Sequence, residues 1–163
     1  MTTFPVPRHF LKAAFCALLA CGLWLAWLWQ PHRQVALHQR SLLHALEQRD
    51  WKEIGSLISH SYRDRWGYDK AFVLGEMPQV FRQFLWLKVT AEERRCETAG
   101  SAGYWEGSLR LAGQGGPFAK AAIARVNSIS GPWTFHWAKS GRWPWDWQLV
   151  AVANEELETL QWE

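Results

Sequence analysis

The residues best suited to acid–base chemistry near the end of the chain are His136 and Asp146. On a hairpin closed by residues 139–141, they would lie diagonally across one face of the two strands. A carboxylate so placed orients an imidazole and raises its pKa. The same hairpin turns the pair away from the neighbouring tryptophans. We therefore expect a solvated or interfacial polar pair there and assign no catalytic residue.

A second set of candidates lies in the polar segment SHSYRDRWGYDK, residues 59–70, which is rich in aromatic residues. Its hydroxyl and carboxyl groups could exchange protons with a ligand held within hydrogen-bond reach. The alternative is a solvated connection whose arginines pair locally with an aspartate. Four residues of this segment are kept as ligand-pocket candidates: Tyr62, Asp64, Tyr68 and Asp69.

The sequence predicts neither a metal site nor a cofactor. His32, His38 and His44 fall on one early helix without the further ligands that a metal site needs. The segment GQGG, Gly113 to Gly116, lacks the lysine and the following helix pattern of a phosphate-binding loop. Cys96 is the only cysteine outside the N-terminal apolar run, so it has no partner for an internal disulfide.

Tryptophan is the most unusual feature of the composition, with 13 copies, and five of them lie in WTFHWAKSGRWPWDWQLV, Trp133 to Val150. The segment AKSGR predicts a hairpin with a three-residue loop, Lys139-Ser140-Gly141, and with Gly141 in the left-handed conformation. This register places six aromatic residues on one side of the ribbon, which we call the aromatic wall: Trp133, Phe135, Trp137, Trp143, Trp145 and Trp147. The wall either fills the core or lines an apolar ligand cavity, so all six are ligand-pocket candidates.

Amphipathic helices precede this hairpin and could cover its apolar side. Leu42, Leu43 and Leu46 follow the helical period of 3.6 residues. Asp50 and Glu53 have the spacing of a capping box that opens a second, short helix. A third helix should begin after Asp69, and Gly75 and Pro78 should break or kink it.

After Phe84 the apolar period changes from about 3.6 to 2, which is typical of strands. We expect strands around residues 85–90 and 104–111, and the weaker alternation over residues 118–129 indicates another. The order of helices followed by strands predicts an α+β fold, with helices packed on a curved antiparallel four-stranded sheet.

The N-terminal run AAFCALLACGLWLAWLW, residues 13–29, contains no charged residue and is 17 residues long. That length is at the short end of what crosses a bilayer as a helix. Its three tryptophans lie at the C-terminal end, where an interfacial aromatic belt would be. We expect an uncut anchor. A lipoprotein signal at LLAC and a cleaved signal peptide are the alternatives, although bulky residues continue beyond any cleavage site.

The balance of charge argues against nucleic-acid binding. Without Arg8 and Lys12, 16 of the 18 lysines and arginines remain against 15 acidic residues, so the rest of the chain is near +1. A nucleic-acid interface needs a basic patch or stripe, and the sequence has no basic run. Basic residues flank the apolar run almost equally, so orientation rests on the short basic N-terminus, which usually stays in the cytoplasm.

The helix ending in LEQRDWKEIGSLIS, the polar linker, the interrupted third helix and the terminal GRWPWDWQLVAV strand resemble the nuclear transport factor 2-like superfamily, which has a cystatin-like α+β cone. The resemblance covers about Val35 to Leu157. It implies a cone whose helices and curved sheet enclose a pocket, often in a dimer. Members include isomerases, dehydratases, polyketide cyclases, transport adaptors and secretion scaffolds. Those that are enzymes use an aspartate, histidine or tyrosine inside the cone.

Together these features predict a single-pass inner-membrane protein with an anchor in residues 1–31 and a nuclear transport factor 2-like domain in residues 32–163. The membrane contact is residues 13–29, and the domain is extracytoplasmic. The expected role is non-enzymatic: protein interaction, as a homodimer or with an unidentified protein, or binding of a small ligand. The alternative is a metal-independent enzyme of the cone-pocket type, an isomerase, dehydratase or hydrolase.

Overall fold

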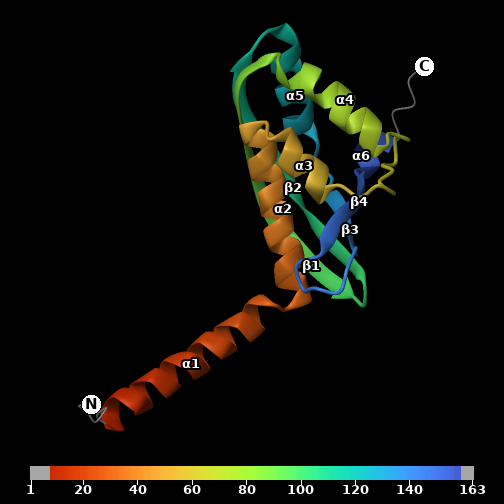
Figure 1. The fold of residues 1–163 in the computed structure, drawn as a ribbon. Helices are drawn as coiled ribbons and strands as arrows, with labels where there is room; N and C mark the ends of the chain where they lie inside the picture. The colour runs from red at the N-terminus through yellow and green to blue at the C-terminus, as the bar shows by residue number, and fades with distance from the viewer. Residues whose placement is uncertain (1–7, 159–163) are drawn as a thin grey trace.

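The computed structural model describes residues 8–158, so the ends of the two predicted domains, residues 1–7 and 159–163, lie outside the described residues. The chain forms helices α1 to α4, then two long strands, a helix, two short strands and a final short helix (Figure 1). Their bounds are α1 Arg8–Leu28, α2 Pro31–Gln48, α3 Trp51–Leu57, α4 Lys70–Phe81, β1 Phe84–Ala99, β2 Ala102–Gly115, α5 Pro117–Ser128, β3 Trp133–Lys139, β4 Trp147–Ala153 and α6 Glu155–Glu158.

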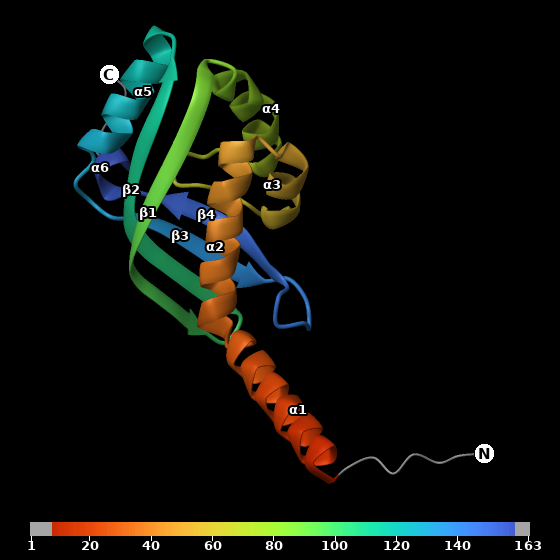
Figure 2. The same ribbon diagram turned by 90° about the vertical axis from the view of Figure 1, so that its left-hand side faces the viewer.

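The four strands form one antiparallel sheet in the order β1-β2-β3-β4. Figure 2 shows α2 crossing the sheet, with α3 and α4 beside it, while α5 lies by the far end of β2. The α+β class is therefore confirmed, as are the antiparallel sheet of four strands and the helices packed on it. The transmembrane character predicted for α1 remains a prediction.

Residues 118–129 are a helix, α5, so the strand predicted there is wrong. Four alanines give the segment a strong helix propensity, and Pro117 occupies the first turn, where its missing N–H is not needed. Ala119 is fully buried against β2, and the Asn127 side chain bonds both the N–H and the C=O of Leu111, each at 2.8 Å. Arg125 and Asn127, which belong to the residues that alternate in the sequence, are exposed, so this alternating set does not form one buried face.

The predicted helix starts at Asp50 and Asp69 are confirmed. The Asp50 carboxylate accepts the N–H of Glu53 at 2.9 Å, and the Asp69 carboxylate accepts the N–H of Phe72 at 2.8 Å. Helix α4, however, runs through Gly75 and Pro78 without the predicted break. Pro78 removes one N–H, but its own carbonyl accepts the N–H of Arg82 at 3.2 Å, so helical bonding resumes after it.

Both outer strands of the sheet are covered, which protects their unpaired backbone groups from other chains. Along β1, the Glu47 carboxylate of α2 accepts the N–H of Val89 at 2.7 Å, and Arg49 donates to the carbonyl of Phe84 at 2.6 Å. Along β4, the linker between α3 and α4 lies beside the strand. There the N–H groups of Ser59 and Arg63 donate to Leu149 and Val150.

Glu47→Ala should lower the free energy of unfolding by about 1–3 kcal/mol, because it leaves the Val89 N–H without its acceptor at a half-buried site. Lys88 also loses its 3.2 Å partner, which adds little because that lysine is largely exposed. Denaturant unfolding measures the difference. Gln48→Ala, an exposed change on the same helix turn, is the control and should stay within about 0.5 kcal/mol of the unmodified chain. Equal values for the two variants would show that Glu47 does not cap the edge.

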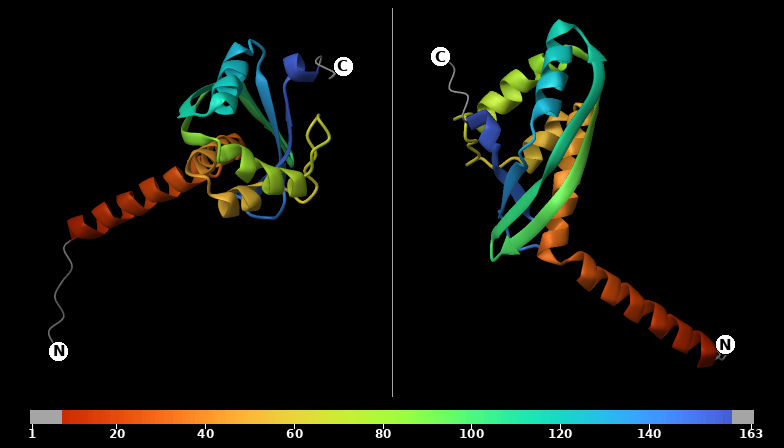
Figure 3. Two further views of the ribbon diagram at one scale, coloured as in Figure 1. Left: turned by 90° about the horizontal axis from the view of Figure 1, so that it is seen from above. Right: turned by 180° about the vertical axis from the view of Figure 1, so that it is seen from behind.

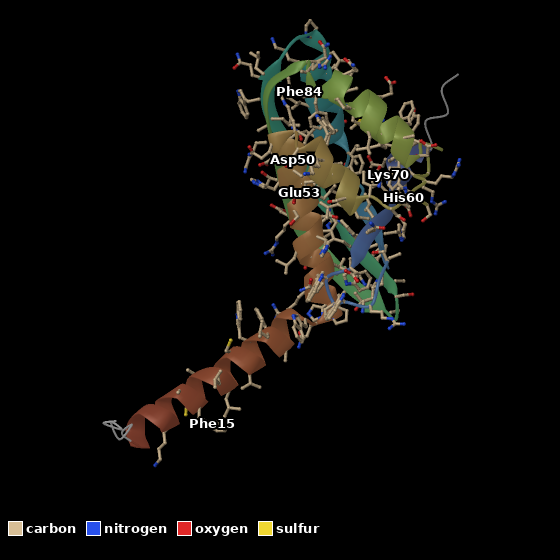
Figure 4. The ribbon with its side chains drawn as sticks, viewed as in Figure 1. Phe15, Asp50, Glu53, His60, Lys70 and Phe84 are labelled. Carbon is tan, nitrogen blue, oxygen red and sulfur yellow. The ribbon has the colours of Figure 1, made fainter. Side chains whose placement is uncertain are left out.

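Helix α1 projects away from the rest of the molecule (Figure 3). Its apolar side chains are exposed along its length, and Phe15 points into open space (Figure 4). In the described part of the chain, no single helix has both the length and the hydropathy expected for a bilayer crossing. A bent pair, Ala14–Trp27 with Pro31–Gln48, meets the criteria jointly, with a bend of 73° between the two helices.

Candidate functional site

The β3–β4 hairpin has a longer loop than predicted. Lys139 pairs with Trp147, Trp137 with Leu149 and Phe135 with Val152, so residues 140–146 form the connection. The three-residue loop Lys139-Ser140-Gly141 and the facing pairs Trp137–Trp143, Phe135–Trp145 and Trp133–Trp147 are therefore wrong. Because proline cannot donate a ladder hydrogen bond, Pro144 disfavours a continuous strand through this segment.

Asp146 holds this loop together. Its backbone carbonyl accepts the N–H of Ser140 at 2.7 Å, and its carboxylate accepts the N–H of Trp143 at 3.0 Å. Gly141 does not adopt the predicted left-handed conformation. A glycine is needed at this position because the Asp146 carboxylate occupies the place that a Cβ would take. The His136–Asp146 pair does not form. His136 instead lies against the Tyr104 ring, with 5.3 Å between ring centroids, and faces Ala151 across the hairpin.

Burial and nearby positive charge both act on the His136 imidazole. Burial lowers its pKa from the ordinary value, and Arg65 lowers it further. The sequence had suggested a carboxylate that would raise this pKa. The neutral ring fits a packing role against Tyr104, whose own phenol has a pKa raised to about 12 by burial and by Glu106.

The aromatic wall is divided between the core and the surface. Phe135, Trp137 and Trp147 are buried, with Trp137 only 1% exposed. Trp133 is partly buried and packs near Trp66, at 6.5 Å between rings. Trp143 and Trp145 leave the sheet with the loop and are 62% and 47% exposed. The prediction that all six side chains share one side of the ribbon is therefore wrong.

The buried aromatic residues fill the interior between α2 and the sheet. The Trp137 indole donates to the Gln39 side chain at 3.2 Å, and its ring lies edge-on to His38 at 6.0 Å. Trp105 of β2, absent from the predicted wall, is 2% exposed and packs edge-on to Phe135 at 5.4 Å. Its place in the alternating pattern around residues 104–111 was the signal that could have found it.

Packing is tight enough that Gly103 has no room for a side chain. A Cβ there would lie 2.6 Å from a methyl group of Val35 and 3.1 Å from the Trp147 ring. Indole rings and the α2 side chains thus meet directly at this level of the cone.

The linker candidates also divide into two pairs. Tyr62 and Asp64 are buried, and the Tyr62 hydroxyl donates to the Asp64 carboxylate. One oxygen of that carboxylate also accepts the N–H groups of Trp66 and Tyr68, at 3.0 and 2.8 Å, so Asp64 shapes the turn. Lys70 closes the linker by donating to the carbonyl of Ile58 at 2.7 Å (Figure 4).

Tyr68 and Asp69 are at the surface instead. The Tyr68 ring stacks on Phe72 with 4.1 Å between centroids, and both rings are more than two-fifths exposed. Asp69 is exposed and caps α4, as described above. The structure therefore does not bring the four linker candidates to one place.

Asp64 gives a test of this structural role through pH. Burial raises the pKa of its carboxyl above the ordinary 3.8, outweighing the backbone donors that lower it. The folded state then holds the proton more tightly than the unfolded state, so stability falls as pH rises upward from about 3.8. Asp64→Asn keeps an oxygen acceptor and loses the titration.

We expect unfolding measured over a series of pH values to show the unmodified chain losing stability relative to Asp64→Asn across that window. Asp69→Asn is the matched control, since Asp69 also accepts a backbone N–H but is exposed. A pH dependence that Asp64→Asn leaves unchanged would exclude Asp64 as its source.

An open groove, which sequence reasoning missed, lies between α2 and β1. Its volume is about 670 Å³, and we call it the α2–β1 groove. Its lining residues are Glu47, Gln48, Arg49, Leu85, Trp86, Leu87 and Lys88. Leu85 and Trp86 are 74% and 50% exposed at its rim. The strand alternation over residues 85–90 gave no sign that α2 would form the other side of this groove.

A second exposed aromatic group lies where α1, α2 and the β3–β4 loop meet. Trp143 and Trp145 stack in parallel at 5.3 Å, and Trp145 lies edge-on to Trp29 at 6.4 Å. We call Trp29, Trp143 and Trp145 the junction cluster. Beside it, the Arg33 guanidinium lies 3.4 Å from the centre of the Trp27 ring.

Over residues 8–158, no group of three or more histidine, cysteine, aspartate or glutamate side chains is placed to hold a metal ion. Cys96 is half-buried, and burial together with Glu93 raises the pKa of its thiol to about 11. That shift disfavours a reactive thiolate at this position.

Solved structures share this fold at low sequence identity. A nuclear transport factor 2-like superfamily protein from Salmonella enterica matches with a TM-score of 0.58 and 13% identity, over 77% of this chain and 89% of that chain. A candidate dehydratase of the same family from Streptomyces avermitilis matches at 0.54 and 14%, over 74% and 91%. A Nostoc punctiforme protein with a cystatin-like fold matches at 0.53 and 9%, over 74% and 86%.

Bd1075 of Bdellovibrio bacteriovorus also matches, with a TM-score of 0.58 and 10% identity. The match covers 75% of this chain but only 39% of the length of Bd1075. No sequence-family model matches this chain, and no curated protein is significantly similar to it in sequence. The predicted nuclear transport factor 2-like, cystatin-like fold is confirmed. At these identities the likeness concerns the fold alone.

Proposed function

We propose that this chain is a membrane-tethered protein-interaction module, with α1 as the tether and the α2–β1 groove as the partner surface. One observation carries the proposal: a helix that has no charged residue from Ala13 to Leu28 leaves the domain with apolar side chains exposed. Leu18 and Leu23 are 72% and 73% exposed, and Trp24 is 57% exposed. Such a surface is unfavourable in water and needs a covering phase.

The apolar run favours a bilayer as that phase. The uncharged run of 17 residues, 13–29, would extend over about 26 Å as a helix, at the short end of what crosses a hydrocarbon core. Arg33 lies beyond the apolar run, at the level where the tryptophans of an interfacial belt would be. We retain the proposal of an inner-membrane location with an extracytoplasmic domain.

The state of the interior favours interaction over catalysis. Tyr62 and Asp64 are buried and bonded to each other and to the linker backbone, so their polar groups already have partners. Trp105, Trp137 and Trp147 are buried in the core cluster. The enzymatic alternative therefore has less support than a docking role for the exposed groove.

The α2–β1 groove suits a partner that is apolar with some polar groups. Leu85 and Trp86 offer exposed apolar area. Within the groove, Lys88 of β1 and Glu47 of α2 form an ion pair at 3.2 Å. Tryptophan is enriched among the residues that dominate protein interfaces. A bound partner would bury the Trp86 ring against the α2 side of the groove.

The test is photocrosslinking in native membranes with benzoylphenylalanine in place of Trp86. We expect a discrete adduct with another protein, or with a second copy of this chain. Benzoylphenylalanine at Ser128, exposed at the end of α5, is the control and should give no discrete adduct. Equal labelling from both positions, or none from Trp86, would overturn the groove as the partner surface.

A further inference from the structure

The junction cluster is an exposed aromatic surface that the fold builds from two distant parts of the chain. Trp29 ends the apolar run, and Trp143 and Trp145 come from the β3–β4 loop. The edge-on contact between Trp29 and Trp145, at 6.4 Å, and the stacking of Trp143 on Trp145, at 5.3 Å, bring the three rings together just beyond the end of α1. Figure 2 shows this loop at the end of the domain from which α1 departs.

The loop holds its indoles outward by its own hydrogen bonds. Asp146 fixes Ser140 and Trp143, the Trp147 indole donates to the carbonyl of Pro144 at 3.0 Å, and Gly141 makes room for the Asp146 carboxylate. The N–H of Lys139 also donates to the carbonyl of Ser101 at 2.8 Å, which ties the loop base to the β1–β2 turn. These bonds keep the Trp143 and Trp145 rings exposed, so the rings are available for contact with another surface.

The charge around the junction cluster is net positive. Arg142 is exposed in the loop, Lys139 lies at its base, and Arg33 follows Trp29 on α2. Glu97 pairs with Arg95 at 2.7 Å, and Asp146, which accepts the Trp143 N–H, contributes one negative charge against these three cations. Indole rings flanked by lysine and arginine match the headgroup layer of a bilayer that contains anionic lipid.

We infer that the β3–β4 loop is a second membrane contact, which inserts Trp143 and Trp145 at headgroup depth beside Trp29. The domain is thereby held against the bilayer at one end, and the α2–β1 groove at the other end of α2 faces away from the junction. This inference rests on the proposed tether, because the loop reaches lipid only if α1 is embedded.

The experiment is depth-dependent fluorescence quenching on the full chain. The native cysteines Cys16, Cys21 and Cys96 are replaced by alanine, and single cysteines carry an environment-sensitive fluorophore. The chain is reconstituted in vesicles of phosphatidylcholine and phosphatidylglycerol that carry a nitroxide either at the headgroup or deep in the acyl chain. The three positions are Arg142→Cys in the loop, Leu18→Cys in α1 and Gln114→Cys at the far end of β2.

We expect the headgroup nitroxide to quench the label at position 142, the deep nitroxide to quench position 18, and neither to quench position 114. Adding Trp143→Ser and Trp145→Ser should abolish the quenching at 142 and leave that at 18 unchanged. Quenching at 142 should weaken when phosphatidylglycerol is omitted. Should Arg142→Cys fold poorly, Lys139→Cys at the base of the same loop serves in its place.

Each other outcome has a separate meaning. Quenching at 18 without quenching at 142 overturns the loop contact and leaves the tether intact. Absence of quenching at both positions overturns the tether as well. A label at 142 that lipid never quenches, but that crosslinks to a protein in native membranes, makes the loop a protein interface and contradicts the inference.

Discussion

Trp137→Ala is expected to lower the free energy of unfolding by about 3–5 kcal/mol, a loss typical of deleting a buried aromatic side chain. The Trp137 ring is 1% exposed, lies against α2 and bonds the buried Gln39 side chain. Truncation would open a cavity between α2 and the sheet and leave the Gln39 oxygen without its donor. Unfolding by denaturant, followed by circular dichroism in detergent, measures the loss.

Trp143→Ala is the matched control, because both tryptophans belong to the same hairpin segment and only the observed register separates them. Trp143 is 62% exposed, so its removal should change stability by no more than about 0.5 kcal/mol. Similar losses from the two variants would support the original three-residue loop, in which Trp137 and Trp143 face each other.

Placing two arginines in α1, Leu18→Arg with Leu19→Arg, should release the protein from membranes. Both leucines lie near the middle of the uncharged run and are exposed. Each arginine at the centre of a membrane helix costs about 2.5–3.5 kcal/mol, so two together outweigh what a short apolar run gains. Flotation of reconstituted protein through a density gradient measures the retained fraction.

The control puts the same two charges on exposed apolar residues of the domain, Leu85→Arg with Phe118→Arg. These side chains are 74% and 52% exposed and far from α1, so this variant should float like the unmodified chain. If the domain variant is lost from membranes and the α1 variant floats, the tether lies elsewhere.

The sequence predicted the fold class because its signals were local and agreed with one another. Asp50 and Asp69 marked helix starts through side chains that bond the nearest free N–H groups. The change of period after Phe84 marked the start of the sheet. Each of these signals depends on residues within a few positions, so neither needed knowledge of the tertiary structure.

The register of the last hairpin could not be obtained in the same way. Alternation of aromatic residues fits several loop lengths, and the choice depends on contacts between Asp146 and the backbone of Ser140 and Trp143. Pro144 was evidence against the predicted register, because a proline within a strand ladder is rare. The loop hydrogen bonds of Asp146 were needed to show that Pro144 lies in the connection between the strands.

The α2–β1 groove and the junction cluster could not be predicted from sequence patterns for a related reason. The α2–β1 groove joins residues about forty positions apart, such as Glu47 and Lys88, and the junction cluster joins Trp29 to Trp145. Such pairs are set by the packing of elements on one another. Exposure of Trp86 and Trp143 likewise follows from where neighbouring elements end, which composition does not reveal.

The central claim is that α1 lies within a bilayer, and the native thiols of Cys16 and Cys21 test it most directly. Both thiols are exposed along α1 when no lipid covers it. In vesicles of the purified full chain, we predict that a membrane-impermeant maleimide leaves both thiols unlabelled until SDS dissolves the bilayer. Full labelling of Cys16 and Cys21 in intact vesicles would contradict the claim.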